Sequence, residues 1–334
     1  MGDETFDIAI VGAGPAGLAC AIEAKKRGYS YVILEKGCVV NSIYRYPREM
    51  VFFTTADLLE IGDVPMILSA DKPKRIDGLN YYRKVVQVWS LDVRDYTRVV
   101  GIDGSRGDFR LRIRSEMPAA QEPIAATVRA RRVILAIGYY DNPNYLDIPG
   151  EDLPKVSHYF AEVHPFFRKK VAIIGGKNSA AEAALLLFRA GAEVTLIHRR
   201  ESLSRDIKYW VLPDIENRIK NNEIQALLGT TVVRIDPGHI WVKNGGGERP
   251  VENDFVFALT GYHPDVDFMR GLGIHVDAAT LRPEHDPATL ETNVSGVYVA
   301  GGMISGRETN KIFIENGRFH GAQILDAPEF GLQL

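Results

Sequence analysis

The chain has very little cysteine. Cys20 and Cys38 are the only two in 334 residues, and no CxxC occurs. Two cysteines are too few for a disulfide framework or for a cysteine-rich metal site. The eight histidines show no HExxH or similar ligand spacing, so we expect no metal centre. The absence of CxxC also excludes a redox centre built on that dithiol.

Long apolar runs and an excess of one charge are absent as well. No apolar run approaches the length of a membrane span, and the residues before the first predicted strand lack the basic and apolar regions of a signal peptide. A net charge of -3 offers no positive excess for a polyanion such as nucleic acid. We expect a cytoplasmic protein that binds neither a membrane nor nucleic acid.

Glycine occurs in an informative pattern near the start of the chain. Residues 7–38 read as strand, glycine turn, helix and second strand, and Gly12, Gly14 and Gly17 form GxGxxG. The first glycine permits a tight turn, the second lets backbone approach a pyrophosphate, and the third lets the helix pack on the strand. Glu35 ends the second strand, where an acid holds ribose hydroxyls. A dinucleotide site is favoured over an ordinary βα turn.

Residues 169–200 repeat this design with a different second strand end. Gly175 and Gly176 form the turn, and the second strand ends at His198, Arg199 and Arg200 instead of an acid. Guanidinium forks match a 2′-phosphate, which favours NADPH here over a reading in which the arginines only face solvent. Lys177 stands where a third glycine is expected, so it restricts backbone approach and is expected to meet phosphate with its charge.

Other segments give weaker expectations. Aromatic side chains within 44–53 either pack a loop or wall a flat ring. A helix is expected over 81–88, with strands over 97–113 and 126–136. An amphipathic helix is expected over 204–222, interrupted by Pro213, and short strands follow it. Gly191 is expected to cap the helix of the second repeat.

Two apolar strands end at Gly138 and Gly261, each followed by Tyr and then Pro. We take these glycines as the two crossings between domains. The predicted domains are therefore residues 1–138 with 262–334, and an inserted domain of residues 139–261. The closing segment reads as a strand, a glycine turn, a loop and a helix whose N–H groups are expected to face a bound ring or phosphate.

Across nearly its whole length the chain resembles the thioredoxin reductase-like flavoproteins, which carry FAD in the first repeat and NADPH in the second. Several motifs resemble the bacillithiol disulfide reductase branch, which lacks CxxC: NSIYRYP, TTADLLEIGD, IKYWVLPDIENRI, ALTGYHPD and TNKIFIENG. The resemblance implies an α/β fold with two Rossmann-like domains of three-layer ββα type. It further implies a homodimer that transfers hydride from NADPH to FAD and then reduces a low-molecular-weight disulfide.

The site residues follow from the two repeats and this resemblance. Those expected at FAD are Gly12, Ala13, Gly14, Pro15, Ala16, Gly17, Glu35, Lys36, Asn41, Ser42, Gly138, Gly302, Lys311 and Ile312. Those expected at NADPH are Gly175, Gly176, Lys177, Asn178, Ser179, His198, Arg199, Arg200 and Gly261.

The chain also departs from its relatives. The segment SHYFAEVHPFF, where thioredoxin reductases carry CxxC, has no cysteine, and Ala16 replaces a cysteine that the branch often has in its first glycine motif. We expect Cys20 to be a core residue and Cys38 to be the one candidate catalytic thiol, unless the flavin acts alone. The alternatives are a ferredoxin or flavodoxin reductase of the same type, and a flavin-based redox sensor.

Overall fold

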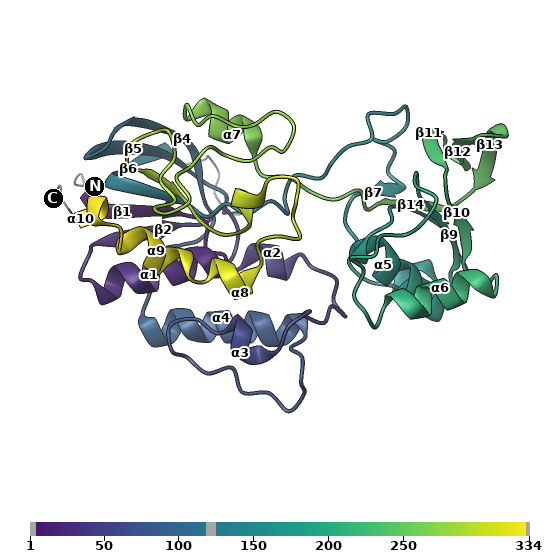
Figure 1. Cartoon of the computed structure of the whole chain (residues 1–334), viewed down its shortest axis with the longest axis horizontal. Coiled ribbons are helices and arrows are strands. Elements are labelled where there is room, and N and C mark those ends of the chain that lie inside the picture. The colour runs from purple at the N-terminus through teal and green to yellow at the C-terminus, as the bar shows by residue number, and fades with distance from the viewer. Residues whose placement is uncertain (1–4, 118–124, 332–334) are drawn as a thin grey trace. The chain divides into compact units, whose positions relative to one another are not determined.

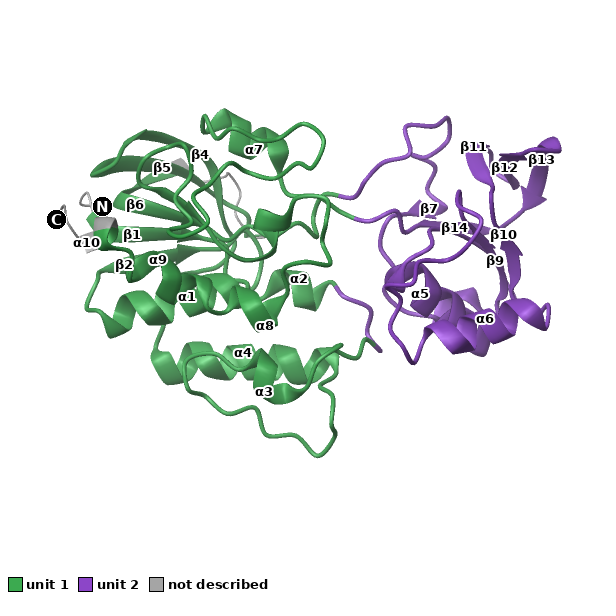
Figure 2. Cartoon of the chain, viewed as in Figure 1, with its two compact units in different colours: residues 1–45, 50–142, 262–334 green, residues 46–49, 143–261 purple. Residues whose placement is uncertain are grey.

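The computed structural model describes residues 5–117 and 125–331, and in it the chain forms two compact units (Figure 2). Unit 1 comprises residues 1–45, 50–142 and 262–334, and unit 2 comprises residues 46–49 and 143–261. Apart from the short stretch 46–49, the chain therefore passes from unit 1 to unit 2 after Asn142 and returns to unit 1 after Gly261.

Unit 1 is built on a sheet in the order β3-β2-β1-β6-β5-β4, with β15 also paired to β6. The strand β6 is shared: its first residues pair with β5 in antiparallel register, and Val133, Ile134 and Leu135 pair with β15 in parallel. One strand thus joins a parallel sheet to an antiparallel hairpin. The strands are β1 (Thr5–Val11), β2 (Tyr31–Leu34), β3 (Val93–Arg94), β4 (Thr97–Ser105), β5 (Asp108–Ser115), β6 (Ala125–Leu135) and β15 (Val297–Val299).

Helices of unit 1 gather beside the parallel sheet, where α1 contacts α9, α8 and α4 (Figure 1). The crossing of α1 and α9 is close because a Cβ on Gly321 would lie 2.8 Å from the Cα of Cys20. Cys20 is fully buried, as expected of a core residue. The helical segments are α1 (Pro15–Lys26), α2 (Asn41–Tyr44), α3 (Ala56–Leu59), α4 (Arg75–Trp89), α7 (Val266–Gly271), η2 (Gly301–Ser305), α8 (Ile314–Gly317), α9 (His320–Leu325) and α10 (Pro328–Gly331).

Unit 2 has a parallel sheet in the order β10-β9-β8-β14-β7 and an antiparallel sheet in the order β11-β12-β13. Its strands are β7 (Val156–Ser157), β8 (Lys170–Ile174), β9 (Glu193–Ile197), β10 (Gln225–Leu227), β11 (Thr231–Ile235), β12 (His239–Asn244), β13 (Gly247–Glu252) and β14 (Phe255–Ala258). Its helical segments are η1 (His164–Phe166), α5 (Asn178–Arg189) and α6 (Leu212–Lys220).

The alternation of β8 explains the layers of unit 2. Val171 and Ile173 belong to the apolar cluster that includes residues of α5 and α6. Ala172 and Ile174 belong to a second cluster with residues of β11 and β12. Successive strand residues point to opposite faces, so the parallel sheet is covered by helices on one face and by the small sheet on the other. The predicted α/β fold of three-layer ββα type is confirmed.

Two expectations for secondary structure were wrong, and one cap was right. The expected helix over 204–222 begins only at Leu212, with Pro213 in its first turn, because proline fits a helix start and not its interior. The expected strand over 97–113 is a hairpin of β4 and β5. Gly191, with φ +84°, lies just beyond α5, as expected of a cap.

Within 5–117 and 125–331, no helix is both long and apolar enough to cross a membrane.

Candidate functional site

The first glycine turn lies between β1 and α1 and combines tight packing with one open position. A Cβ on Gly12, whose φ is +108°, would lie 2.5 Å from the Ala136 carbonyl oxygen, and one on Gly17 would lie 2.0 Å from the Gly12 oxygen. A Cβ on Gly14 would have no described atom within 4 Å. No side chain therefore fits at Gly12 or Gly17, whereas the position beside Gly14 is open. A pyrophosphate requires such an open position at a helix N-terminus.

Glu35 closes the turn from the end of β2. Its side chain is buried, Oε2 accepts a hydrogen bond from the Ala13 N–H at 2.8 Å, and Oε1 accepts one from the Gly37 N–H at 2.8 Å. Burial raises the pKa of Glu35, an effect that the two N–H donors oppose. A carboxylate oxygen can accept two hydrogen bonds, so each oxygen retains acceptor capacity for a ribose hydroxyl.

The segment after Glu35 packs against the same turn. The Val40 N–H donates to the Ala13 oxygen at 3.0 Å. The Asn41 side chain lies 2.6 Å from where a Cβ on Gly37 would stand, and Ser42 follows it in α2. Lys36 forms an ion pair with Asp141 at 2.8 Å. Asp141, which was not among the expected site residues, also forms an ion pair with Arg45, so Lys36 shares this carboxylate with a second cation.

The turn that follows β15 meets the first glycine turn directly. A Cβ on Gly301 would lie 2.8 Å from the Cβ of Ala16, and the Gly301 N–H donates to Nδ1 of His320 at 3.0 Å. A Cβ on Gly302 would lie 2.6 Å from the ring of Tyr139, the residue after the predicted crossing glycine Gly138. The structure thus brings together positions near 16, 139, 301 and 320.

His320 and Tyr139 were missed because no local motif marks them. Burial, and secondarily the charge of His285, lowers the pKa of His320 to about 4. The imidazole is therefore neutral, with its proton on Nε2, since Nδ1 accepts from Gly301. Burial raises the pKa of Tyr139 to about 12. Lys311 and Ile312 precede α8, and the Ile312 oxygen lies 3.7 Å from the Cβ position of Gly302.

Cys38 is a free, half-buried thiol whose Sγ lies 3.7 Å from Oδ1 of Asn41. Burial raises the pKa of Cys38, and the carboxylates of Glu35 and Asp95 add to this effect. Reactive cysteines have a lowered pKa, so this environment disfavours the thiolate. A catalytic role for Cys38 stays a prediction that its surroundings do not favour.

The second glycine turn lies between β8 and α5, with Gly175 N–H donating to the Ile197 oxygen at 3.0 Å. The His198 ring lies 2.3 Å from where a Cβ on Gly176 would stand, so only glycine fits beneath it. Burial, with the charges of Arg200 and Arg199, lowers the pKa of His198. A neutral imidazole therefore covers the turn.

The charged groups around this turn are accessible. Arg199, Arg200 and Lys177 are exposed. No side chain caps the N-terminus of α5, where Asn178 and Ser179 are the first two residues, so its first N–H groups are open to an anion. Gly261 follows β14 with φ +95°, and its Cβ position is 3.1 Å from Nδ2 of Asn144.

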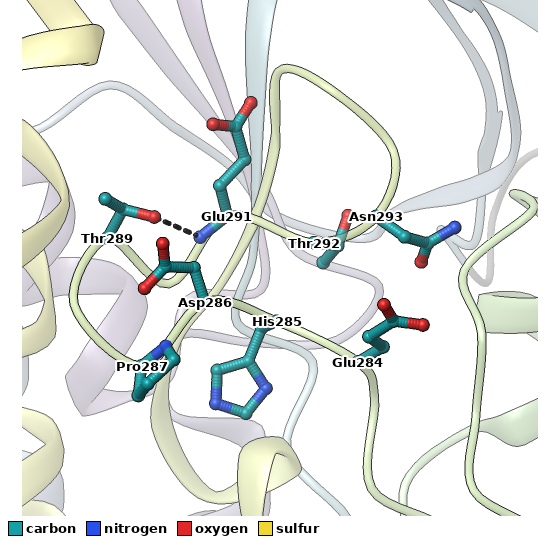
Figure 3. Close-up of a pocket in the computed structure, with 8 residues that line it drawn as sticks. All are labelled: Glu284, His285, Asp286, Pro287, Thr289, Glu291, Thr292 and Asn293. Carbon is teal, nitrogen blue, oxygen red and sulfur yellow. Dashed lines mark hydrogen bonds between the residues drawn. The ribbon is translucent and has the colours of Figure 1, made fainter.

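Unit 1 also has an open groove of about 570 Å³ beside α9, lined by residues 284–287, 289 and 291–293. Figure 3 shows the carboxylates of Glu284, Asp286 and Glu291 around it, together with the ring of His285. Nε2 of Gln323 in α9 donates to the Pro287 oxygen at 2.7 Å. The described residues contain no group of three His, Cys, Asp or Glu that could hold a metal ion.

Comparison with known proteins identifies the family. Residues 9–301 match the model of the pyridine nucleotide-disulphide oxidoreductases. The chain is 44% identical over 317 residues to bacilliredoxin reductase Bdr of Bacillus subtilis (strain 168), covering 94% of this chain and 95% of that protein. It is also 25% identical over 307 residues to a ferredoxin–NADP reductase of Ignicoccus hospitalis, covering 88% of this chain and 89% of that protein.

Solved structures agree with this result. The bacillithiol disulfide reductase Bdr (YpdA) of Bacillus cereus superimposes with a TM-score of 0.93 at 41% identity, covering 97% of this chain and 98% of that one. The corresponding protein of Staphylococcus aureus gives a TM-score of 0.92 at 38% identity, covering 99% and 100%. The resemblance read from the sequence motifs is confirmed. Membership implies the use of a pyridine nucleotide together with a flavin, and the chain belongs to the pyridine nucleotide-disulphide oxidoreductase family as an oxidoreductase enzyme.

Proposed function

We propose that the chain is an NADPH-dependent FAD enzyme that reduces a low-molecular-weight disulfide of the bacillithiol type. The observation that carries this proposal is 44% identity, over 94% of the chain, to a protein named bacilliredoxin reductase. The two glycine turns support it because their second strands end differently, in Glu35 and in His198–Arg200.

In this proposal unit 1 holds FAD. The open position at Gly14 and the N-terminus of α1 receive the pyrophosphate, and Glu35 receives the ribose hydroxyls. Ala16 and Gly301 bring the turn after β15 against this cradle. FAD, when bound, supplies the redox chemistry that links NADPH to the disulfide.

Unit 2 holds NADPH. Gly175, Gly176 and the first turn of α5 face the pyrophosphate, while Arg199 and Arg200 bind the 2′-phosphate. The half-buried imidazole of His198 has a lowered pKa and adds no charge of its own, so phosphate recognition rests on the exposed cations. These residues bind and orient the nucleotide and take no part in bond making.

The balanced reaction consumes NADPH, one proton and a disulfide, and yields NADP⁺ and two thiols. The chain's own thiols are poorly suited to relay electrons, because Cys20 is buried with a pKa raised to about 12 and Cys38 has a raised pKa. We therefore propose that the disulfide is reduced without a protein thiol of this chain.

We also propose that the enzyme is a cytoplasmic homo-oligomer.

The second candidate function is a ferredoxin–NADP reductase, favoured by the 25% identity to such an enzyme and by the absence of CxxC. The deciding measurement is steady-state NADPH oxidation by the FAD-loaded protein with bacillithiol disulfide, ferredoxin or no acceptor. We expect turnover with the disulfide. Turnover with ferredoxin but not with the disulfide would support the second candidate. Reduction of the bound flavin by NADPH, without turnover of either the disulfide or ferredoxin, would indicate a redox sensor.

A further inference from the structure

Asp141 lies in unit 1 between two residues that bind other segments of the same unit. The ring of the preceding Tyr140 lies 4.6 Å from that of Tyr262, measured between centroids. The oxygen of the following Asn142 accepts the His263 N–H at 2.9 Å. The backbone of Asp141 is therefore held on both sides, and its carboxylate, only 16% exposed, extends from a fixed position.

This carboxylate binds two cations from the segment that follows β2. Its Oδ2 atom lies 2.8 Å from Nζ of Lys36, and its Oδ1 atom forms an ion pair with Arg45. Lys36 is the residue directly after Glu35. The Lys36 ammonium is thus held on Asp141, although the carboxylate of Glu35 belongs to its immediate neighbour in the chain.

The charges of Lys36 and Asp141 both act on Glu35. Burial is the largest cause of the raised pKa of Glu35, and the N–H groups of Ala13 and Gly37 oppose it. Among the charged groups, Lys36 lowers this pKa and Asp141 raises it. The three charged side chains therefore lie close enough to influence one another, with Lys36 between two carboxylates that it could neutralise.

The acceptor capacity of Glu35 is limited. Each of its two oxygens already accepts one backbone N–H at 2.8 Å. A carboxylate oxygen accepts about two hydrogen bonds, so one position on each oxygen remains for a ribose hydroxyl. An ammonium group carries three donors, and its attraction to a carboxylate is stronger at a buried site than in water. A released Lys36 would therefore compete with the ribose for these positions.

We propose that Asp141 is a positioning residue that holds the Lys36 ammonium away from Glu35, so that the Glu35 carboxylate stays available to the ribose hydroxyls of the cofactor. The inference rests on the FAD site proposed for unit 1 and deepens it. It also changes the role of Lys36, which the sequence placed among the residues at FAD. Its side chain is instead a competitor of the ribose that Asp141 restrains.

The test measures the affinity of the full chain for FAD by equilibrium dialysis, with flavin absorbance as the readout. Asp141→Asn removes the negative charge with little change in shape. It should weaken FAD binding about tenfold, as expected for the loss of a hydrogen bond to a charged acceptor. The matched control is Arg45→Gln, which removes the second cation on Asp141 and leaves Lys36 paired. This control should change the affinity by less than about twofold.

Removal of the competing ammonium separates positioning from a general structural effect. Adding Lys36→Met to Asp141→Asn should recover most of the lost affinity, because no ammonium then competes for Glu35. If Asp141 acted on the fold alone, or if Lys36 bound FAD directly, the double variant would bind FAD no better than Asp141→Asn. Either result would overturn the proposal, as would an unchanged affinity in Asp141→Asn.

A second variant covers the case in which Asp141→Asn does not fold because Arg45 has lost its partner. Asp141→Asn combined with Arg45→Gln removes both members of that ion pair and still releases Lys36. It should show the same loss of FAD affinity and the same recovery on addition of Lys36→Met. A loss without recovery would again contradict the role given to Asp141.

The proposed function fails separately. A wild-type chain that binds no FAD contradicts the FAD assignment of unit 1 and this inference together. A wild-type chain that binds FAD, with Asp141→Asn indistinguishable from it, leaves the FAD assignment standing and overturns the role of Asp141 alone.

Discussion

His320 should make the stability of unit 1 depend on pH in the mildly acidic range. Its Nδ1 accepts the Gly301 N–H at 3.0 Å, beside the first glycine turn. Protonation would put a proton on Nδ1 against that N–H donor and would bury a charge near His285. We choose His320→Asn as the perturbation because an amide oxygen can accept the same hydrogen bond and does not titrate.

The magnitude follows from the pKa of about 4 in the folded chain, below the ordinary value of 6.5. A histidine with a lowered folded-state pKa takes up its proton more readily when unfolded. Its neutral form therefore contributes stability that is fully present above pH 6.5 and is lost as the pH falls toward 4. Linkage gives a loss on the order of 2 kcal/mol between pH 7.5 and pH 5.

Urea unfolding at pH 7.5 and pH 5 would measure this effect. The fluorescence of Trp89 in α4 reports on unit 1 once Trp210 and Trp241 are replaced by Phe. In that background the free energy of unfolding of the protein with His320 should fall by about 2 kcal/mol more than that of His320→Asn between pH 7.5 and pH 5. If the free energies of unfolding of the two proteins differ by the same amount at pH 7.5 and pH 5, the reasoning is refuted, since His320 would then have the same pKa in the folded and unfolded states.

Three further predictions concern the cofactor sites. Gly17→Ala should destabilise unit 1 by about 3 kcal/mol in urea unfolding through overpacking, since its Cβ would lie 2.0 Å from the Gly12 oxygen. Gly14→Ala should leave the free energy of unfolding nearly unchanged but lose bound FAD, measured as flavin absorbance after gel filtration. Equal effects of the two variants on stability and on bound FAD would contradict this distinction. Arg199→Glu with Arg200→Glu should weaken NADPH by at least about tenfold more than NADH in binding titrations, and equal losses would rule out a 2′-phosphate contact. Cys38→Ser should leave disulfide turnover unchanged, and a large loss of turnover would restore Cys38 as a relay.

Features encoded in consecutive residues could be predicted from the sequence. The turn at Gly12, Gly14 and Gly17 has the steric roles expected of each glycine, because the βαβ pattern fixes backbone geometry locally. The repeat at Gly175 was recognised for the same reason. The cofactors assigned to these turns remain proposals.

Contacts between distant segments could not be predicted. His320 reaches Gly301 and the neighbourhood of Ala16 only after the chain has returned to the first turn, and nothing in its own sequence context indicates that return. The late start of α6 has the same kind of cause. Ile207 and Val211 are apolar at a helical spacing, but both side chains pack into the core of unit 2, and the Asn178 side chain binds the Asp206 oxygen and the Lys208 N–H in place of helical partners.

The sharing of β6 between β1 and β15 has a consequence for the order of folding during synthesis. Residues 143–261 of unit 2 form one continuous stretch, whereas unit 1 needs residues 297–299 of β15 and the helix α9 to complete the sheet and cover α1. Domains fold as units as they leave the ribosome. Unit 2 can therefore fold while the first glycine turn still lacks its covering segments, so the nascent chain should acquire the nucleotide binding proposed for unit 2 before that proposed for unit 1.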